Sequence, residues 1–180
     1  MGTTILCAAA GRRAISLACV WLGLAGASLA AEDARLLTVV LPGKAPATLT
    51  ASDFAQMPRS TTTMERDGET ATYEGVLLYD VLLKAWGLPP GKTLPVNAKL
   101  TYILGTARDG YQAMFALAEI APMFSGTHVL VADKRDGGPL LAYQRPLQVI
   151  APQDKAQGRS MFSLVKIELV DLSRAHAESK

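Results

Sequence analysis

The sequence predicts a mixed, β-rich α+β domain with short helices. Short segments in which apolar and polar residues alternate outnumber stretches with a helical period, and turn-forming glycines and prolines separate them. The chain of 180 residues contains no internal repeat and no Pro- or Ser-rich linker. We therefore expect one domain over residues 36–171, followed by a polar tail at 172–180.

The first strand and the first helix are predicted from local patterns. The apolar run Leu36–Leu41 ends at a Pro-Gly pair, which is typical of a strand followed by a turn. Thr50 and Asp53 have the spacing of a capping box, in which side chains bond the free backbone groups of a helix start. We expect a short helix that begins near Thr50 and ends at Pro58.

The clearest helix of the sequence is Leu78–Trp86. Its apolar residues recur at i, i+3, i+4 and i+7, which places them on one face. Gly87 is a natural left-handed stop, and the two prolines that follow forbid continuation. A short strand over Tyr73–Val76 is expected just before this helix.

The second half of the domain should consist mostly of strands. Alternation over Leu100–Gly105 and over Tyr111–Leu117, joined by the turn Arg108–Gly110, predicts a β-hairpin. An irregular or helical piece is expected at 122–126, and Asp136–Pro139 has the composition of a turn. Further strands are expected over residues 127–132, 147–150 and 165–169.

Residues 1–30 have the three parts of an export signal. Arg12-Arg13 form a basic region, Ala14–Leu24 an apolar stretch, and Ala27–Ala30 a small-residue cleavage site. The apolar stretch is shorter than the roughly 20 residues of a membrane-spanning helix. We expect cleavage near Ala30 and a periplasmic or secreted protein with no membrane span in the mature chain.

Three other interpretations of this segment carry less weight. An uncleaved N-terminal anchor is the first. A twin-arginine signal is the second, but the residues after Arg12-Arg13 lack the large apolar residue and the lysine of such signals. A lipoprotein acylated at Cys19 is the third, and Ser16–Ala18 is a poor lead-in for it.

Cleavage would remove both cysteines, Cys7 and Cys19, together with two of the basic residues. The mature chain is then neutral by formal count, because 16 acidic residues face an equal number of basic ones. This balance argues against a nucleic-acid partner and against a polybasic membrane contact. No thiol remains for a disulfide, a cysteine nucleophile or a thiolate metal ligand.

The common catalytic and metal-binding motifs are absent from the sequence. There is no phosphate-binding glycine loop, dinucleotide fingerprint, paired-histidine helix or nucleophile elbow. The two histidines are His128 and His176, and the second lies in the polar tail. A metal site from His128, Asp133 and Asp136 would need a geometry that strand alternation disfavours. We therefore assign no catalytic residue and no metal ligand.

The candidate ligand-binding residues are polar groups in two loop regions. The first set surrounds the expected hairpin turn: Arg108, Asp109 and Tyr111. The second set flanks late strands: Arg145, Arg159 and Ser160. An exposed arginine beside an aromatic residue suits an anionic or planar ligand, and the second set would form an anion pocket if it converges. Turn chemistry alone also explains Asp109 and Gly110, and ordinary surface exposure also explains the second set.

Several short segments follow one another in an order that has a counterpart in a known family. They are Tyr73–Leu83, Ala107–Tyr111, Pro139-Leu140, Pro146–Ile150, Gly158-Arg159 and Val165–Ile167. With these segments the chain resembles the molybdopterin-binding domain of the sulfite oxidase family, over nearly the whole mature chain. The resemblance implies a mixed fold with a mostly β core, an exported location in bacteria and molybdopterin as the cofactor.

The resemblance also implies a cysteine ligand to molybdenum upstream of Tyr73, and this chain has none there. The corresponding stretch, Arg59–Arg66, offers threonine oxygens and the thioether of Met64, and neither replaces a thiolate well. Only Arg159, beside Gly158, matches a position that contacts the cofactor in that family.

These observations favour an exported, non-catalytic domain that binds a small anionic ligand or an envelope protein partner and that has no cofactor. One alternative is a molybdopterin-dependent oxidoreductase whose metal is held by the dithiolene and oxygen ligands alone. Another is a structural or chaperone-like accessory of an envelope complex. Fold by itself does not choose among the three.

Overall fold

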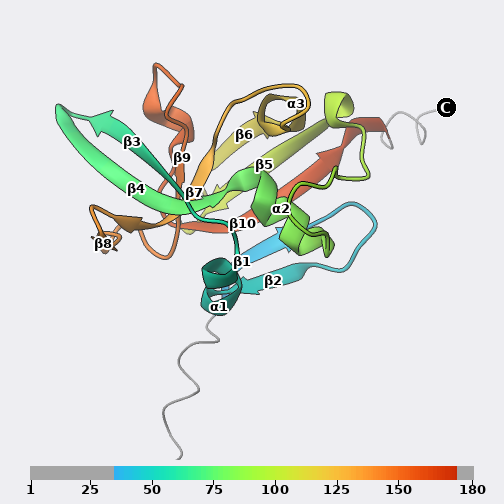
Figure 1. Cartoon of the computed structure of the whole chain (residues 1–180), viewed down its shortest axis with the longest axis horizontal. Helices are drawn as coiled ribbons and strands as arrows, with labels where there is room; N and C mark the ends of the chain where they lie inside the picture. Colours follow the sequence, from blue (N-terminus) through green and yellow to red (C-terminus); the bar gives the residue numbers. More distant parts are fainter. Residues whose placement is uncertain (1–34, 174–180) are drawn as a thin grey trace, which may run out of the picture. The chain divides into compact units, whose positions relative to one another are not determined.

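Two β-sheets form the framework of the protein (Figure 1). The structure, a computed structural model, describes residues 35–173. The expected export signal at 1–30, and most of the expected tail with His176, lie outside the described residues. The division into one domain over 36–171 stays a prediction.

The first sheet has the strand order β2-β1-β10-β5-β6. Its strands are β1 (Arg35–Val40), β2 (Ala47–Thr50), β5 (Thr101–Ala107), β6 (Gln112–Ala116) and β10 (Leu164–Asp171). β1 and β10 pair in parallel, and the other neighbours are antiparallel. The first and last strands of the described chain therefore lie side by side inside one sheet.

The second sheet is antiparallel and has the order β3-β4-β7-β8, with β9 also paired to β7. Its strands are β3 (Ser60–Arg66), β4 (Glu69–Leu77), β7 (Leu130–Arg135), β8 (Gly138–Pro139) and β9 (Gln148–Ile150). β4 and β7 approach closely at Gly75, where a Cβ atom would lie 2.1 Å from the carbonyl oxygen of Val131. Only glycine fits that position without a shift of the backbone.

Short α-helices and 3-10 helices connect the strands. They are α1 (Ala51–Gln56), α2 (Leu78–Trp86), α3 (Leu117–Ile120), η1 (Ala98–Leu100) and η2 (Gln157–Arg159). α1 has the predicted capping box, because Thr50 Oγ1 accepts from the backbone N–H of Asp53 and the Asp53 carboxylate accepts from the backbone N–H of Thr50. α2 has the predicted bounds and ends at Gly87, whose φ is 81°.

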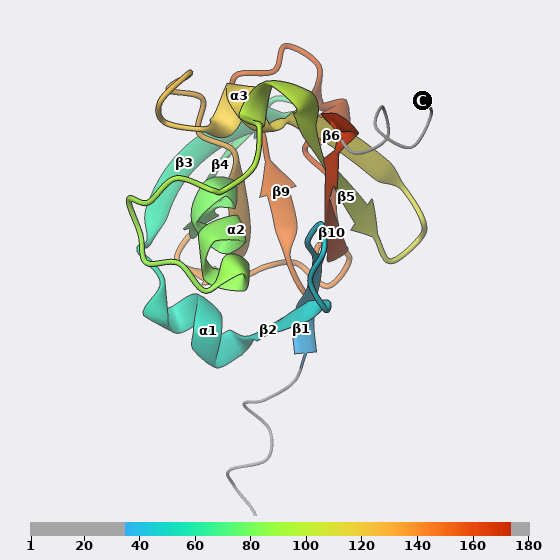
Figure 2. The same cartoon turned by 90° about the vertical axis from the view of Figure 1, so that its right-hand side faces the viewer.

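The core lies between the two sheets and extends onto a second face. α2 contacts β2 of the first sheet and β4 and β7 of the second, and Figure 2 shows it between the β3–β4 ribbon and β10. Alternation sends Val131 and Val149 into this main core and Leu130 and Ile150 into a smaller cluster on the other face of β7 and β9. The second sheet is therefore covered on both faces.

The predicted fold class, mixed and β-rich with short helices, is confirmed. The hairpin is confirmed as β5 and β6. Of the predicted turn at 136–139, Asp136-Gly137 joins β7 to β8, and Gly138-Pro139 form β8. In β5, however, the side that faces the core is not the more apolar side of the predicted alternation. Thr101, Ile103 and Gly105 are buried, whereas Leu100, just before the strand, is exposed.

Several elements and boundaries differ from the predictions. β2 and β3 were not predicted, β4 is longer than Tyr73–Val76, and Leu117 opens α3 instead of closing the hairpin. β7 begins at Leu130 and not at Thr127, because the backbone N–H of Thr127 donates to Ser125 Oγ in a local turn. The carbonyl of Val129 then accepts from the backbone N–H of Leu78, at the start of α2.

Among residues 35–173, no helix has both the length and the apolar character needed to cross a bilayer.

Candidate functional site

A hollow of about 270 Å³ opens where the hairpin turn meets the end of β3 and the segment 157–162. We call it the hairpin hollow. The residues of its wall that matter here are Arg66, Asp109, Tyr111, Gln157, Ser160 and Phe162. Three of them, Asp109, Tyr111 and Ser160, belong to the predicted ligand-binding residues, so the fold brings members of both sets together.

The hairpin turn is fastened to the segment 157–162. The hydroxyl of Tyr111 donates to the carbonyl oxygen of Gly158 at 2.7 Å, although half of the tyrosine is exposed. Asp109 Oδ1 accepts from the backbone N–H of Tyr111 at 2.9 Å, as a turn aspartate does. Tyr111 therefore joins two walls of the hollow, whereas Asp109 stabilises the turn.

Arg66, the last residue of β3, supplies the positive charge of the hairpin hollow. Its Nε donates to Gln157 Oε1 and its Nη2 to the carbonyl oxygen of Ser160 at 3.1 Å. The guanidinium carbon lies 4.5 Å from the ring centre of Phe162, at cation–π distance. Within residues 35–173 Arg66 forms no ion pair, so no carboxylate is in direct contact with its guanidinium.

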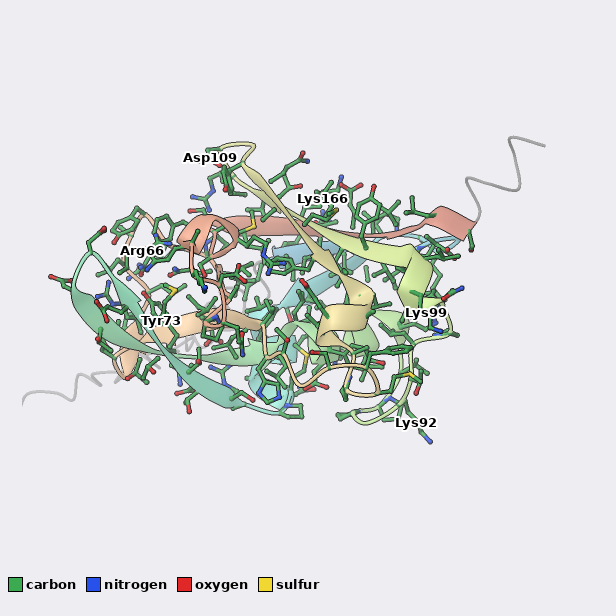
Figure 3. The ribbon with its side chains drawn as sticks, turned by 90° about the horizontal axis from the view of Figure 1, so that it is seen from above. Arg66, Tyr73, Lys92, Lys99, Asp109 and Lys166 are labelled. Atoms are coloured by element: carbon green, nitrogen blue, oxygen red, sulfur yellow. The ribbon has the colours of Figure 1, made fainter. Side chains whose placement is uncertain are left out.

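A second, more polar hollow of about 280 Å³ also has Arg66 in its wall, together with Glu69, Tyr73, Arg135 and Tyr143. Arg135 is balanced by acidic groups, because its Nε donates to Asp136 at 3.1 Å and its Nη2 lies 3.8 Å from Glu69. In Figure 3, Arg66, Tyr73 and Asp109 lie towards one end of the described domain, and Lys92 and Lys99 lie towards the other. Arg66 is the guanidinium that the two hollows share.

Arg159 has the opposite surroundings. Its Nε and Nη2 donate to the two oxygens of Asp154 at 2.8 and 2.6 Å, and its Nη1 donates to Glu119 at 2.7 Å. The bonds to Asp154, together with the charge of Glu119, raise the pKa of Arg159 above its usual value. The guanidinium thus ties η2 to α3 and does not line the hairpin hollow. Its predicted contact with a cofactor stays a prediction.

The other predicted residues are placed as follows. Arg108 is exposed at the hairpin turn, where its side chain has no bonded partner among the described residues. Arg145 Nε donates to the carbonyl oxygen of Leu140 at 2.8 Å. Ser160 is buried, and its Oγ accepts from the backbone N–H of Ala151 at 2.9 Å. Arg145, Arg159 and Ser160 do not line a common hollow of those described here.

The residues present do not fit a molybdenum centre held by the protein. In β3, where the resemblance implies a cysteine, Met64 is buried in the smaller core cluster. Residues 35–173 contain no cysteine and no group of three His, Cys, Asp or Glu side chains arranged to hold a metal ion. Since a buried thioether and threonine hydroxyls are poor substitutes for a thiolate, we derive no redox step at this site.

Sequence reasoning did not single out Arg66. The residue lies in the stretch where the resemblance implies a cysteine, and it precedes the turn at Asp67-Gly68. An arginine just before an Asp-Gly turn is the one local signal that could have found it. Its contacts with residues 157–162, more than ninety positions later, have no local signature.

No protein-family model and no curated protein matches this chain. Among solved structures it is similar to the sulfane dehydrogenase SoxCD from Paracoccus pantotrophus, with a TM-score of 0.58 and 16% sequence identity. The match covers 76% of this chain and 38% of that chain. At this identity the likeness shows the fold alone: the chain has a fold found in part of an oxidoreductase.

Proposed function

We propose that this chain is an exported, non-catalytic domain with an oxidoreductase-like fold that binds a small anionic ligand in the hairpin hollow. The observation that carries the proposal is Arg66. It is half-buried, it lines two hollows, and its bonded partners are neutral oxygens. A guanidinium that is fixed in place but not neutralised is suited to an anion.

The geometry around Arg66 favours a small ligand. Gln157 and the carbonyl of Ser160 occupy Nε and Nη2, which leaves Nη1 for a ligand oxygen. Tyr111 and Phe162 provide an aromatic wall, against which a charge-assisted hydrogen bond is less exposed to water. The carboxylate of Asp109 lies in the same wall, so a bulky polyanion would meet a like charge.

The non-catalytic part of the proposal is supported by the donor set. The two cysteines, Cys7 and Cys19, both fall within the expected signal, and the stretch 59–66, where a thiolate is implied, has the buried Met64 as its one sulfur-containing residue. Export is supported by the signal pattern of residues 1–30. Fractionation of the native host tests it, and full-length protein retained in the cytoplasm would contradict export.

Anion binding is tested by thermal unfolding in sulfate and in phosphate, with chloride replacing them at constant ionic strength. Both anions stabilise folded proteins in general, so specific binding should appear as a larger rise in Tm for the wild type than for Arg66→Gln. Lys92→Gln is the matched control, since this exposed cation lies far from the hollow (Figure 3). An equal response of the wild type and Arg66→Gln would contradict the proposal.

The cofactor question is tested separately, by metal analysis and pterin fluorescence of protein purified from the native host. We expect no stoichiometric molybdenum. One molybdenum per chain would overturn the non-catalytic assignment and favour the alternative in which the dithiolene and oxygen ligands alone hold the metal.

A further inference from the structure

A second candidate site lies on the surface of α2, away from the hairpin hollow. Asp80, in the first turn of this helix, lies between two hollows and lines both of them. One hollow, of about 150 Å³, extends towards the segment 120–129. The other, of about 210 Å³, extends towards residues 56–58 and 88–90. We call this surface the Asp80 surface.

The walls on either side of Asp80 are mostly apolar. The first hollow is walled chiefly by Leu77, Ile120, Pro122 and Val129. The second is walled chiefly by Met57, Pro58, Leu83, Leu88 and Pro89. A single carboxylate therefore separates two apolar depressions.

The Asp80 carboxylate has no hydrogen-bond or ion-pair partner within the described residues. It forms no hydrogen bond and no ion pair there, although Lys84 is one helical turn further on. Lys84 is already engaged, because its Nζ lies 3.1 Å from Asp53. Burial raises the pKa of Asp80, which is the expected result when a carboxylate loses water and gains no partner.

The size of the hollows indicates what kind of molecule fits. Sites for small organic ligands usually enclose about 300–1,000 Å³. Each of these hollows is smaller and suits a side chain or two, as the anchor pockets of protein interfaces do. An unpaired carboxylate between them disfavours lipid headgroup phosphates and nucleic acids and favours a cation. The other titratable groups are Tyr79 and the exposed His128 in the first hollow and Lys84 in the second.

We propose that the Asp80 surface docks a protein segment in which a basic residue, bound to Asp80, has apolar residues on both sides that fill the two hollows. In an extended segment, side chains that face one surface are two positions apart. The recognised pattern is therefore apolar-x-basic-x-apolar. This inference concerns a different surface from the hairpin hollow and stands independently of the proposed anion site.

The test uses the capped peptide Leu-Ser-Arg-Ser-Leu and the same peptide with citrulline, the neutral counterpart of arginine. Titrated into ¹⁵N-labelled full-length protein, the arginine peptide should shift amide signals in α2 and in residues 126–129. Asp80→Asn should weaken binding about tenfold or more, and so should citrulline. Citrulline should cause no further loss in Asp80→Asn, because both changes remove one ion pair.

Asp67→Asn is the matched control and should retain wild-type affinity. It removes an exposed carboxylate elsewhere on the surface, at a position with φ of 54° that asparagine tolerates. Arg66→Gln should also bind the peptide normally, which separates this surface from the anion site. Equal affinity of wild type and Asp80→Asn would overturn the proposal. So would butylamine or guanidinium binding as tightly as the peptide, because that would assign the surface to a small cation.

Discussion

Arg66 and Arg159 contact the same short segment, residues 157–162, and end in opposite electrostatic surroundings. Arg159 belongs to the segment and is held by Asp154 and Glu119, although 36% of its side chain is exposed. Arg66 reaches the segment from β3 and meets only neutral oxygens and an aromatic ring. Availability to an anion is therefore decided by which carboxylates the fold brings close, and not by exposure.

Two carboxylates near α2 repeat the contrast with the opposite charge. Asp53 is bonded by Thr50 and paired with Lys84, and the bond from the Thr50 backbone lowers the pKa of Asp53. Asp80, on the same side of the helix as Lys84, has no such partner, and burial raises its pKa. Charged groups that have a partner of opposite charge stabilise the fold, whereas a ligand gains the most binding free energy at charged groups that have none.

The largest expected effect on stability follows from removing Arg159, the arginine that is paired with carboxylates. Arg159→Met should lower the free energy of unfolding by about 2 kcal/mol, because it leaves Asp154 and Glu119 partly buried without a cation, a cost reduced by solvent screening. Urea unfolding measures it. Arg108→Met, at an exposed arginine, should change stability by less than about 0.5 kcal/mol. Equal effects of the two variants would mean that the ion pairs contribute nothing.

Removing Arg66, the arginine without a carboxylate partner, should reduce stability less. Arg66→Met should lower the free energy of unfolding by about 1 kcal/mol, since the bonds that it loses are to neutral acceptors. In saturating sulfate the gap between wild type and Arg66→Met should widen, whereas the gap between wild type and Arg159→Met should stay constant. A gap that widens for Arg159→Met instead would reverse the assignment of the two arginines.

The satisfied carboxylate should give a smaller, pH-dependent effect. Asp53→Ala should cost about 0.5–1 kcal/mol at pH 7 through loss of the capping box. Because the pKa of Asp53 is lowered on folding, this stabilisation is fully present above the unfolded value of about 3.9 and is lost as the pH falls through the folded value. Unfolding curves between pH 7 and pH 2.5 should therefore converge at the acid end. A constant gap would contradict the lowered pKa.

The unsatisfied carboxylate should give the smallest effect, with the opposite sign. Asp80→Asn should raise the free energy of unfolding at pH 7 by less than about 0.5 kcal/mol, because it removes a partly desolvated charge. Since the pKa of Asp80 is raised on folding, the penalty exists only above the unfolded value of about 3.9, and the gain should vanish in more acidic solution. Destabilisation by Asp80→Asn at pH 7 would show that the carboxylate has a partner.

The elements that were predicted correctly are those with a local cause. The Thr50–Asp53 capping box, the apolar face of α2 and its stop at Gly87 each depend on residues within one or two turns. β3 lacks such a cause: Met64 is its one buried residue, and it forms an edge strand whose threonines show no apolar alternation. The strand exists because β4 pairs with it along its whole length.

Of the candidate site, the residues that were predicted are mainly those with a local sequence signature. The turn at Asp109-Gly110 has a local signature, so the hairpin and Tyr111 were found. The bond from the Tyr111 hydroxyl to Gly158, and the contacts of Arg66 with Gln157 and Ser160, join residues far apart in the chain. No window of sequence contains both partners of such contacts.

The sequence by itself determined the β-rich fold class, the helix α2 with its cap, the hairpin and the absence of cysteine after Cys19. These follow from periodicity, turn chemistry and composition, which are properties of neighbouring residues or of counts. Only the tertiary structure decided which charges are paired: Arg159 bonds Glu119 across forty positions, and Arg66 forms no ion pair within the described residues. The physical reason is that an ion pair depends on distance in space, and the pairing of β1 with β10 and the packing of the two sheets set that distance.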